Sequence, residues 1–207
     1  MQNAAPTLHR VRQRGTLQLA FVSAVIALAA VFAAVGSTIP LFNVYRAEDG
    51  FTNAGISMTV VAYSIGTIGA LLVLGRLSNY VGRRAAAVTS LALLLSGCLV
   101  LLNVHFIGVL IAGRLLMGLG AGMASSSLAA YIVDAAPRRP AWLASVASSQ
   151  TVMLGLAVGA IASGALVQFG PWPRQLIFLV AIILLLVSAV LISISPETVT
   201  PTPFVWR

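Results

Sequence analysis

The sequence has very few residues suited to facing water. Charged residues make up 8% of its 207 positions, only four side chains are carboxylates, and every one of the twelve lysine-plus-arginine positions is arginine. Because charged residues make up about a quarter of an average soluble domain, this composition excludes a soluble globular protein. The arginines are spread along the chain rather than gathered on one face, so no nucleic-acid partner is expected.

Cysteine is almost absent. The single cysteine, Cys98, lies in an apolar stretch, cannot form an internal disulfide, and has no accompanying cluster of cysteine and histidine of the kind that binds zinc. The apolar stretches also lack the paired carboxylates on which acid–base catalysis depends. The sequence therefore predicts no cofactor and no metal, and an enzyme is the least favoured class.

Long uncharged stretches fill the chain instead. Hydrophobic residues make up 59% of the sequence, and the mean hydropathy is +1.02. A helix needs about 20 apolar residues to cross a bilayer, and backbone groups in lipid must be bonded within their own segment, which favours helices over open strands. The sequence predicts an all-α membrane protein with one bundle of six transmembrane helices. These are expected at about residues 16–40, 54–77, 84–103, 106–131, 142–169 and 174–195.

The positions of the arginines predict the orientation of the bundle. Cytoplasmic loops of membrane proteins are enriched in positive charge. With the amino terminus inside, nine arginines lie on the cytoplasmic side, whereas only Arg46 and Arg174 lie outside and Arg114 lies within a helix. Both termini are therefore predicted to face the cytoplasm, in the cell (inner) membrane.

The connections between the helices are expected to be short. Pro40 and residues 46–53 should form the first outer loop, because proline is disfavoured inside a helix. The chain then divides into a basic cytoplasmic amino terminus at 1–15, the six-helix bundle at 16–195, and a cytoplasmic tail or the start of a linker at 196–207.

The turn after the second helix has a distinctive pattern of glycine and arginine. Gly75 leaves room for another helix to approach, Gly82 allows a sharp reversal, and a basic pair sits at the cytoplasmic headgroups. The turn resembles the loop signature of the major facilitator superfamily, G-x-x-x-(D/N)-(R/K)-x-G-R-(R/K), with Tyr80 in place of a basic residue. Ordinary membrane topology also explains such a turn. The residues that carry the resemblance, and would form a gating loop, are Gly75, Asn79, Gly82, Arg83 and Arg84.

Arg114 is the only strongly ionisable residue away from the ends of a predicted helix. If the helix began after Arg114, the apolar residues 106–113 would be left in water. An unpaired cation at the membrane centre costs at least about 2.5 to 3.5 kcal/mol on insertion scales, so we expect a cavity or a partner. The alternative is an arginine that reaches toward the membrane surface. The stretch resembles the superfamily pattern L-x-x-x-R-x-x-(Q)-G-x-G-A, with Met117 at the glutamine position, which implies contact with substrate or a part in proton coupling.

Small residues recur in the fourth and fifth helices. Small residues spaced by four form flat faces for close helix packing in any membrane bundle. The fifth helix also resembles the G-x-x-x-G-P-x-x-G-G motif of proton-coupled antiporters, particularly drug-efflux members, with Ala160 and Ser163 departing from it. The positions expected to pack are Gly118, Gly122, Gly155, Gly159 and Gly164. Gln150 belongs to a polar stretch of the fifth helix that either lines an aqueous path or bonds to neighbouring helices.

Charged residues near the predicted inner ends could form a network. Glu197 belongs to a Ser-Pro-Glu-Thr sequence that resembles the P-E-(T/S) ending of the sixth helix in many superfamily members. Solvated loop charges are the simpler interpretation. The candidate members are Asp134, Arg138, Arg139 and Glu197.

Taken together, the chain resembles the amino-terminal half of a major facilitator transporter. Such transporters consist of two six-helix bundles with substrate bound between them near the midplane. The resemblance implies a secondary carrier of small organic solutes that works by alternating access, with efflux favoured and the proton as a possible coupling ion. It also implies a second bundle as partner, either a covalent half or a second copy of the chain. A non-transporting six-helix subunit and an uptake symporter are the alternatives.

Overall fold

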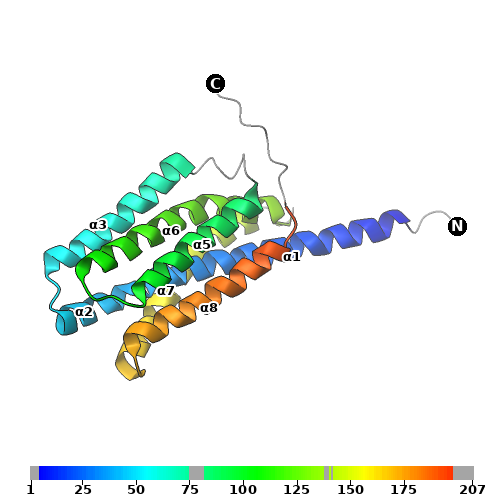
Figure 1. Cartoon of the computed structure of the whole chain (residues 1–207). Helices are drawn as coiled ribbons and strands as arrows, with labels where there is room; N and C mark the ends of the chain where they lie inside the picture. The colour runs from blue at the N-terminus through cyan, green and yellow to red at the C-terminus, as the bar shows by residue number, and fades with distance from the viewer. Residues whose placement is uncertain (1–4, 75–81, 138–139, 141, 198–207) are drawn as a thin grey trace.

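A computed structural model describes the backbone of residues 5–74, 82–137, 140 and 142–197 (Figure 1). All regular structure in these ranges is helical, and six helical segments are long and apolar enough to cross a membrane. The predicted fold class is therefore confirmed. The six segments are Thr16–Asp49, Asn53–Val73, Arg83–Leu101, Ile107–Ala135, Leu143–Phe169 and Arg174–Ile194.

Two helices, α1 and α2, together make the first of these segments, and a short π-helix, η1, extends α3. The elements in chain order are α1 (Ala5–Gly36), α2 (Thr38–Asp49), α3 (Asn53–Gly69), η1 (Ala70–Leu74), α5 (Arg83–Leu101), α6 (Ile107–Ala135), α7 (Leu143–Phe169) and α8 (Pro173–Ile194).

The first outer connection differs from the prediction. A loop beginning at Pro40 was wrong, because α2 continues to Asp49 and leaves only residues 50–52 before α3. Pro40 is the third residue of α2, and the first turn of a helix has no use for the N–H that proline lacks. The helix ends at Gly50, whose φ of 66° is a left-handed conformation that glycine adopts readily. At the other end, α1 begins at Ala5, so its helical backbone starts before Thr16, where the first candidate span begins.

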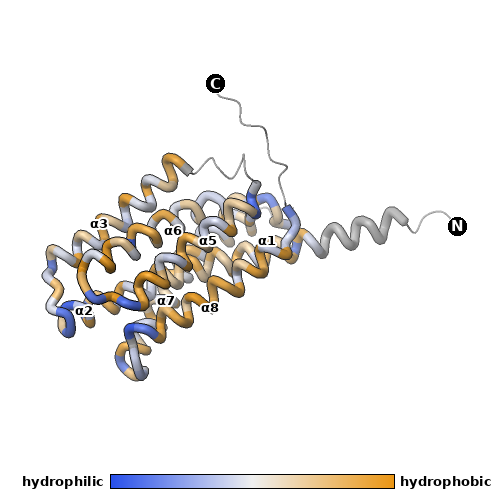
Figure 2. Tube along the Cα trace, in the orientation of Figure 1, coloured by the Kyte–Doolittle hydropathy of each residue, from blue (hydrophilic) through white to orange (hydrophobic). Residues whose placement is uncertain are grey.

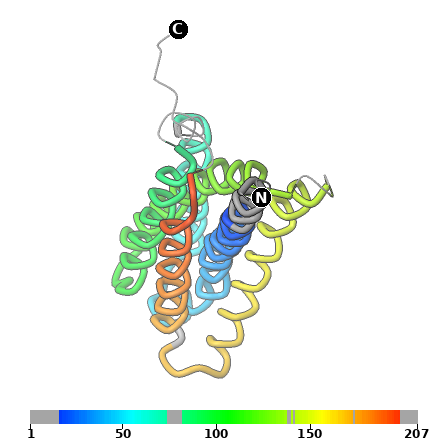
Figure 3. Tube along the Cα trace, turned by 90° about the vertical axis from the view of Figure 1, so that its right-hand side faces the viewer, coloured from blue at the N-terminus to red at the C-terminus, as the bar shows by residue number. Residues whose placement is uncertain are grey.

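α1 and α6 lie at the centre of the bundle. Within their most apolar windows 61% and 56% of the residues are buried, against 22% in α3 and 17% in α7. α6 packs between α3 and α5, and α1 packs between α7 and α8, as Figure 3 shows for the latter pair. α3 and α7 thus each pack against the bundle through a narrow face, and the rest of their apolar surface is exposed.

Glycine forms the stripe that joins α3 to α6. A Cβ atom on Gly118 would lie 2.2 Å from the carbonyl oxygen of Tyr63, and one on Gly122 would lie 2.5 Å from that of Thr67. Any side chain at either position would collide with the backbone of α3. The two helices therefore approach as closely as small residues permit.

The contact between α1 and α7 is built in the same way. A Cβ atom on Gly155 would lie 2.8 Å from the carbonyl oxygen of Ala29, and one on Gly159 would lie 2.0 Å from that of Ala33. The expectation that Gly164 also packs here is not met, since a Cβ atom there would have nothing within 4 Å. Buried Ser163 takes the third place instead, because residues spaced by four share one helix face.

Polar residues gather at the two ends of the bundle, and apolar residues run between them (Figure 2). The beginning of α1 and the end of α8 lie at the same end (Figure 1). This arrangement follows from six membrane crossings, because an even number of crossings returns the chain to the side on which it began. Which side of the membrane that end faces is still a prediction from the arginine distribution.

Candidate functional site

Arg114 lies in the first third of α6 and is buried, with 4% of its surface exposed. Its contacts come from two neighbouring elements, α2 and α3. Nη1 donates a hydrogen bond to Oγ1 of Thr38 at the start of α2. The side chain therefore stays between helices and does not extend to the membrane surface.

Two aromatic rings hold the guanidinium group. Its central carbon lies 5.3 Å from the ring centroid of Phe42 on α2 and 4.8 Å from that of Tyr63 on α3. An arginine at this distance from a ring face is attracted to the π electrons, by about 2 kcal/mol when the pair is desolvated. The rings thus offset part of the cost of keeping this cation within a transmembrane helix.

The four side-chain carboxylates of the chain all lie in described residues, and each makes contacts elsewhere. Glu48 and Asp49 pair with Arg174, and Asp134 pairs with Arg83. Glu197 accepts bonds from backbone N–H groups at the start of α5. Across the part of the chain that the structure describes, Arg114 forms no ion pair with any of them.

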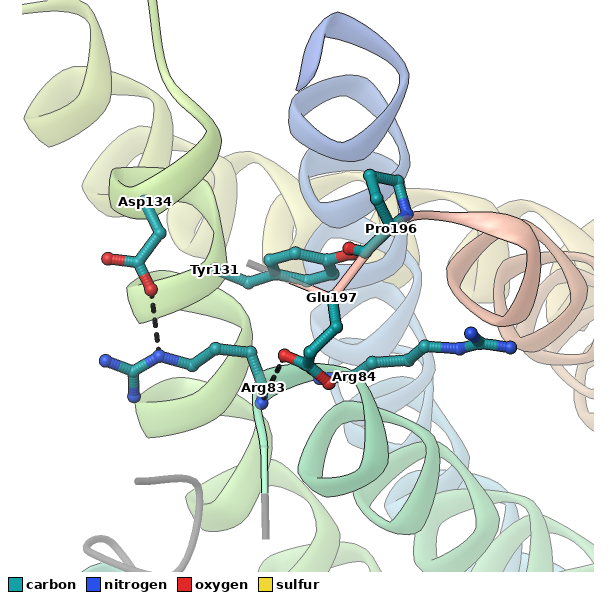
Figure 4. A network of polar contacts seen from close by, with 6 residues as sticks. All are labelled: Arg83, Arg84, Tyr131, Asp134, Pro196 and Glu197. Atoms are coloured by element: carbon teal, nitrogen blue, oxygen red, sulfur yellow. Dashed lines mark hydrogen bonds and ion pairs between the residues drawn. The ribbon is translucent and has the colours of Figure 1, made fainter. Parts of the chain in front are cut away.

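A second polar cluster lies at the end of the bundle where α8 ends and α5 begins (Figure 4). Glu197 accepts hydrogen bonds from the backbone nitrogens of Arg83, at 2.9 Å, and Arg84, at 3.1 Å. These N–H groups belong to the first turn of α5, where no partner within the helix exists. A carboxylate is favoured here both as a hydrogen-bond acceptor and by the helix dipole.

Gly82 makes room for this contact. Its φ of 102° is a conformation that other residues rarely adopt, and a Cβ atom on it would lie 2.8 Å from Oε2 of Glu197. Nearby, the hydroxyl of Tyr131 donates to the carbonyl oxygen of Pro196, which fixes the segment after α8 against α6. The glycine predicted to allow a reversal thus also admits the carboxylate.

Asp134 joins the same cluster through Arg83, whose Nε lies 2.9 Å from Oδ2 of Asp134 (Figure 4). The structure therefore brings together five residues that the sequence put in two groups: Gly82, Arg83 and Arg84 of the loop motif, and Asp134 and Glu197 of the charge network. The other predicted members, Gly75, Asn79, Arg138 and Arg139, lie outside the described residues.

Gln150 does not join either cluster. It lies on the exposed side of α7, whereas its neighbour Thr151 is buried. The structure thus places Gln150 on the open face of the bundle.

A third cluster, which the sequence did not indicate, lies at the opposite end of the bundle. Arg174 at the start of α8 contacts the carboxylates of Glu48 and Asp49, and its guanidinium carbon lies 4.8 Å from the ring centroid of Tyr45. These groups join α2 to α8. The sequence does place these three charged residues near the expected outer loops. It does not show that they meet, because Arg174 follows Asp49 by 125 positions along the chain.

Comparison with known proteins agrees with this architecture. The sequence profile of the Major Facilitator Superfamily matches residues 20–204, which includes all of the transmembrane region after the start of the first span. The chain therefore belongs to the Major Facilitator Superfamily. It is a multi-pass membrane protein of a family of transporters that act on small molecules.

Individual relatives match shorter stretches. "MFS efflux transporter aclA" of Aspergillus oryzae is 36% identical over 100 residues, covering 48% of this chain and 18% of the relative. "Proton myo-inositol cotransporter" of Homo sapiens is 37% identical over 82 residues, covering 40% and 12%. "Uncharacterized MFS-type transporter EfpA" of Mycobacterium tuberculosis is 26% identical over 153 residues, covering 72% and 29%. The chain thus spans less than a third of the length of these relatives.

Proposed function

We propose that this chain forms one six-helix bundle of a secondary transporter that moves small organic solutes by alternating access against a second bundle. The observation that carries the proposal is the exposure of α3 and α7. Large apolar side chains cover both, including Ile65 on α3, Leu72 on the adjoining η1, and Met153 and Ile161 on α7, all more than 60% exposed. These helices flank the central pair α1 and α6, so a second bundle placed against them would enclose the face between them.

Arg114 supports transport over a purely structural role. A non-transporting bundle gains little from a cation in the membrane, whereas a transporter uses buried ionisable groups for substrate or ion contact. Arg114 is positioned by residues of α2 and α3 that belong to the same bundle. It would therefore keep its position when one bundle moves relative to the other.

The cluster around Glu197 supports a rigid inner end. It ties the segment after α8 to the first turn of α5 and to α6. Motion by alternating access then takes place between bundles, with each bundle moving as a unit. We place this end at the cytoplasm, in the inner membrane, from the arginine distribution.

Direction and coupling are the finer parts of the proposal. Efflux is supported by the fungal relative named as an efflux transporter and by the glycine pattern of α7. Proton coupling is supported by the human relative named as a proton cotransporter. We therefore propose proton-coupled export, with the second bundle supplied either by a covalent half or by a second copy of this chain.

The test is solute flux in proteoliposomes in which the number of bundles per vesicle is counted by single-molecule photobleaching. Three radiolabelled or fluorescent probes sample charge: ethidium as a cation, myo-inositol as a neutral solute and benzoate as an anion. We expect saturable, proton-gradient-dependent flux of at least one probe when two bundles are present, and none from vesicles with one bundle. Saturable flux from one bundle would contradict the two-bundle mechanism. No flux of any probe with two bundles present would contradict transport of these solute classes.

A further inference from the structure

Within the part of the chain that the structure describes, most of the hydrogen-bonding capacity of Arg114 is unused. A guanidinium group has five N–H donors in one plane. Within the described residues its single hydrogen bond runs from Nη1 to Thr38. Nε is fully buried and has no hydrogen-bond partner in the part of the chain that the structure describes. Buried donors of this kind are rare in folded proteins because leaving them unpaired is costly.

The geometry of the cage restricts where a partner can bind. Phe42 and Tyr63 lie over the guanidinium group, so a ligand must approach in its plane. Nη1 is engaged with Thr38, which leaves the edge formed by Nε and the neighbouring Nη2. The N–H bonds of that edge are parallel, and this fork matches the two oxygens of a carboxylate.

No carboxylate among the residues that the structure describes contacts this fork. The chain's only four carboxylate side chains make contacts at the two ends of the bundle, as described above. Phe42 and Tyr63 are only partly buried, so the two rings reach the surface of the bundle, whereas Arg114 beneath them is buried. An anion from outside the chain is therefore the chemistry that completes the site.

We propose that the Nε–Nη2 edge of Arg114 binds a carboxylate of the transported solute, so that the substrates are organic anions. This inference rests on the proposed transport function. A transported anion fits better than a permanent carboxylate of the second bundle for a physical reason. The two rings already offset part of the charge of Arg114, so the site can release its ligand, and a permanent pair across the bundles would have to break in every cycle.

The experiment is a titration of the full 207-residue chain in detergent micelles, followed by NMR of arginine labelled with ¹⁵N at Nε. The Nε–H signal of Arg114 is identified by its loss in Arg114→Lys, a variant that keeps the charge but lacks the fork. If that variant does not fold, the signal is assigned by its shift in Thr38→Val, which removes the acceptor of Nη1. The probes are sodium benzoate and benzamide, which have the same size and shape but differ in charge. Arg46→Lys is the matched control, because Arg46 is exposed near the end of α2 and bonds to Asn43 and Asn53.

We expect benzoate to shift the Arg114 Nε–H signal downfield saturably and benzamide to leave it unchanged. The Kd for benzoate in the variants is measured by isothermal titration calorimetry, because Arg114→Lys lacks the Nε–H signal. It should rise by about tenfold or more in Arg114→Lys, because lysine cannot bind both oxygens in parallel, and stay constant in Arg46→Lys. Equal shifts with benzamide, no shift with benzoate, or equal shifts at all arginines would overturn the proposal. A signal already downfield in chain extracted from its native membrane, and insensitive to benzoate, would assign the fork to a permanent partner and overturn it too. Flux of any probe without benzoate binding would refute this inference alone, whereas benzoate binding without flux would refute the transport proposal.

Discussion

Oε1 of Glu197 lies 2.9 Å from the backbone nitrogen of Arg83, a residue 114 positions earlier in the chain. The contact joins the last residue described after α8 to the first residue of α5. It replaces a side chain at the N-cap, because the N-cap residue is Gly82 and has no side chain to offer. A residue distant in sequence thus provides the cap for a transmembrane helix.

Removing this cap should loosen the start of α5. Glu197→Ala should lower stability by about 0.5 to 1 kcal/mol, within the range for loss of an N-cap and reduced by the exposure of the carboxylate. Glu197→Gln should have a smaller effect, since it keeps an acceptor and loses the charge. Hydrogen exchange at the amides of Arg83 and Arg84 measures the effect directly. Glu48→Gln at the other end of the bundle is the control, and exchange that is equally slow in all variants would show that Glu197 does not cap α5.

The contact between α1 and α7 should not tolerate a side chain at Gly159. Gly159→Val would place its Cβ on the backbone of Ala33, and overpacking of this kind costs about 1 to 3 kcal/mol. Gly164→Ala is the matched control in the same helix, because its Cβ has open space. There the higher helix propensity of alanine should raise stability by about 0.5 to 1 kcal/mol. Thermal unfolding in detergent compares the two, and equal loss in both variants would mean that Gly159 is not a packing position.

The contact between α2 and α8 should depend on Arg174. Arg174→Gln removes its pairing with Glu48 and Asp49 and the attraction to the ring of Tyr45. Because the cluster is partly exposed, the loss should be about 1 kcal/mol or less, and high salt should reduce it further. Unfolding measured at low and high ionic strength checks both points. A loss that is independent of salt would assign the effect to packing instead of charge.

The arginine asymmetry predicts that both termini face the cytoplasm. Green fluorescent protein fused after Arg207 should fluoresce, and alkaline phosphatase at the same position should be inactive. Alkaline phosphatase inserted at Gly50, between α2 and α3, should be active and serves as the control. Phosphatase activity at the carboxyl end would reverse the orientation of the whole bundle.

Helix number and type could be predicted from the sequence because lipid permits few alternatives. A charge-free stretch of this length must be helical wherever it crosses the membrane, whatever its contacts are. The end of the first span was missed for a local reason: Pro40 signals a break in a helix interior, but here it stands in the first turn of α2. Sequence alone does not distinguish the two positions.

The sites were harder to predict because their parts are far apart in the chain. The sequence marks Arg114 as unusual, since a lone cation in an apolar stretch is costly. It does not reveal that Phe42 and Tyr63 hold it, because aromatic residues in transmembrane helices ordinarily face lipid or the core. For Gly164, a packing contact was expected and is absent. Gly164 follows Gly159 by five residues rather than four, and the extra residue turns it away from α1. Composition indicates which residues are exceptional, and packing decides what they contact.

The most direct test of the account is transport by Arg114→Ala compared with Arg46→Ala, each in an assembly that contains two bundles. Both variants remove one arginine, but Arg114 is buried against α2 and α3, whereas Arg46 is exposed near the end of α2. We predict that Arg114→Ala abolishes saturable flux of the transported probe at near-normal membrane abundance, while Arg46→Ala retains it. Equal flux by Arg114→Ala and the parent chain would contradict the account and leave Arg114 with a structural role alone.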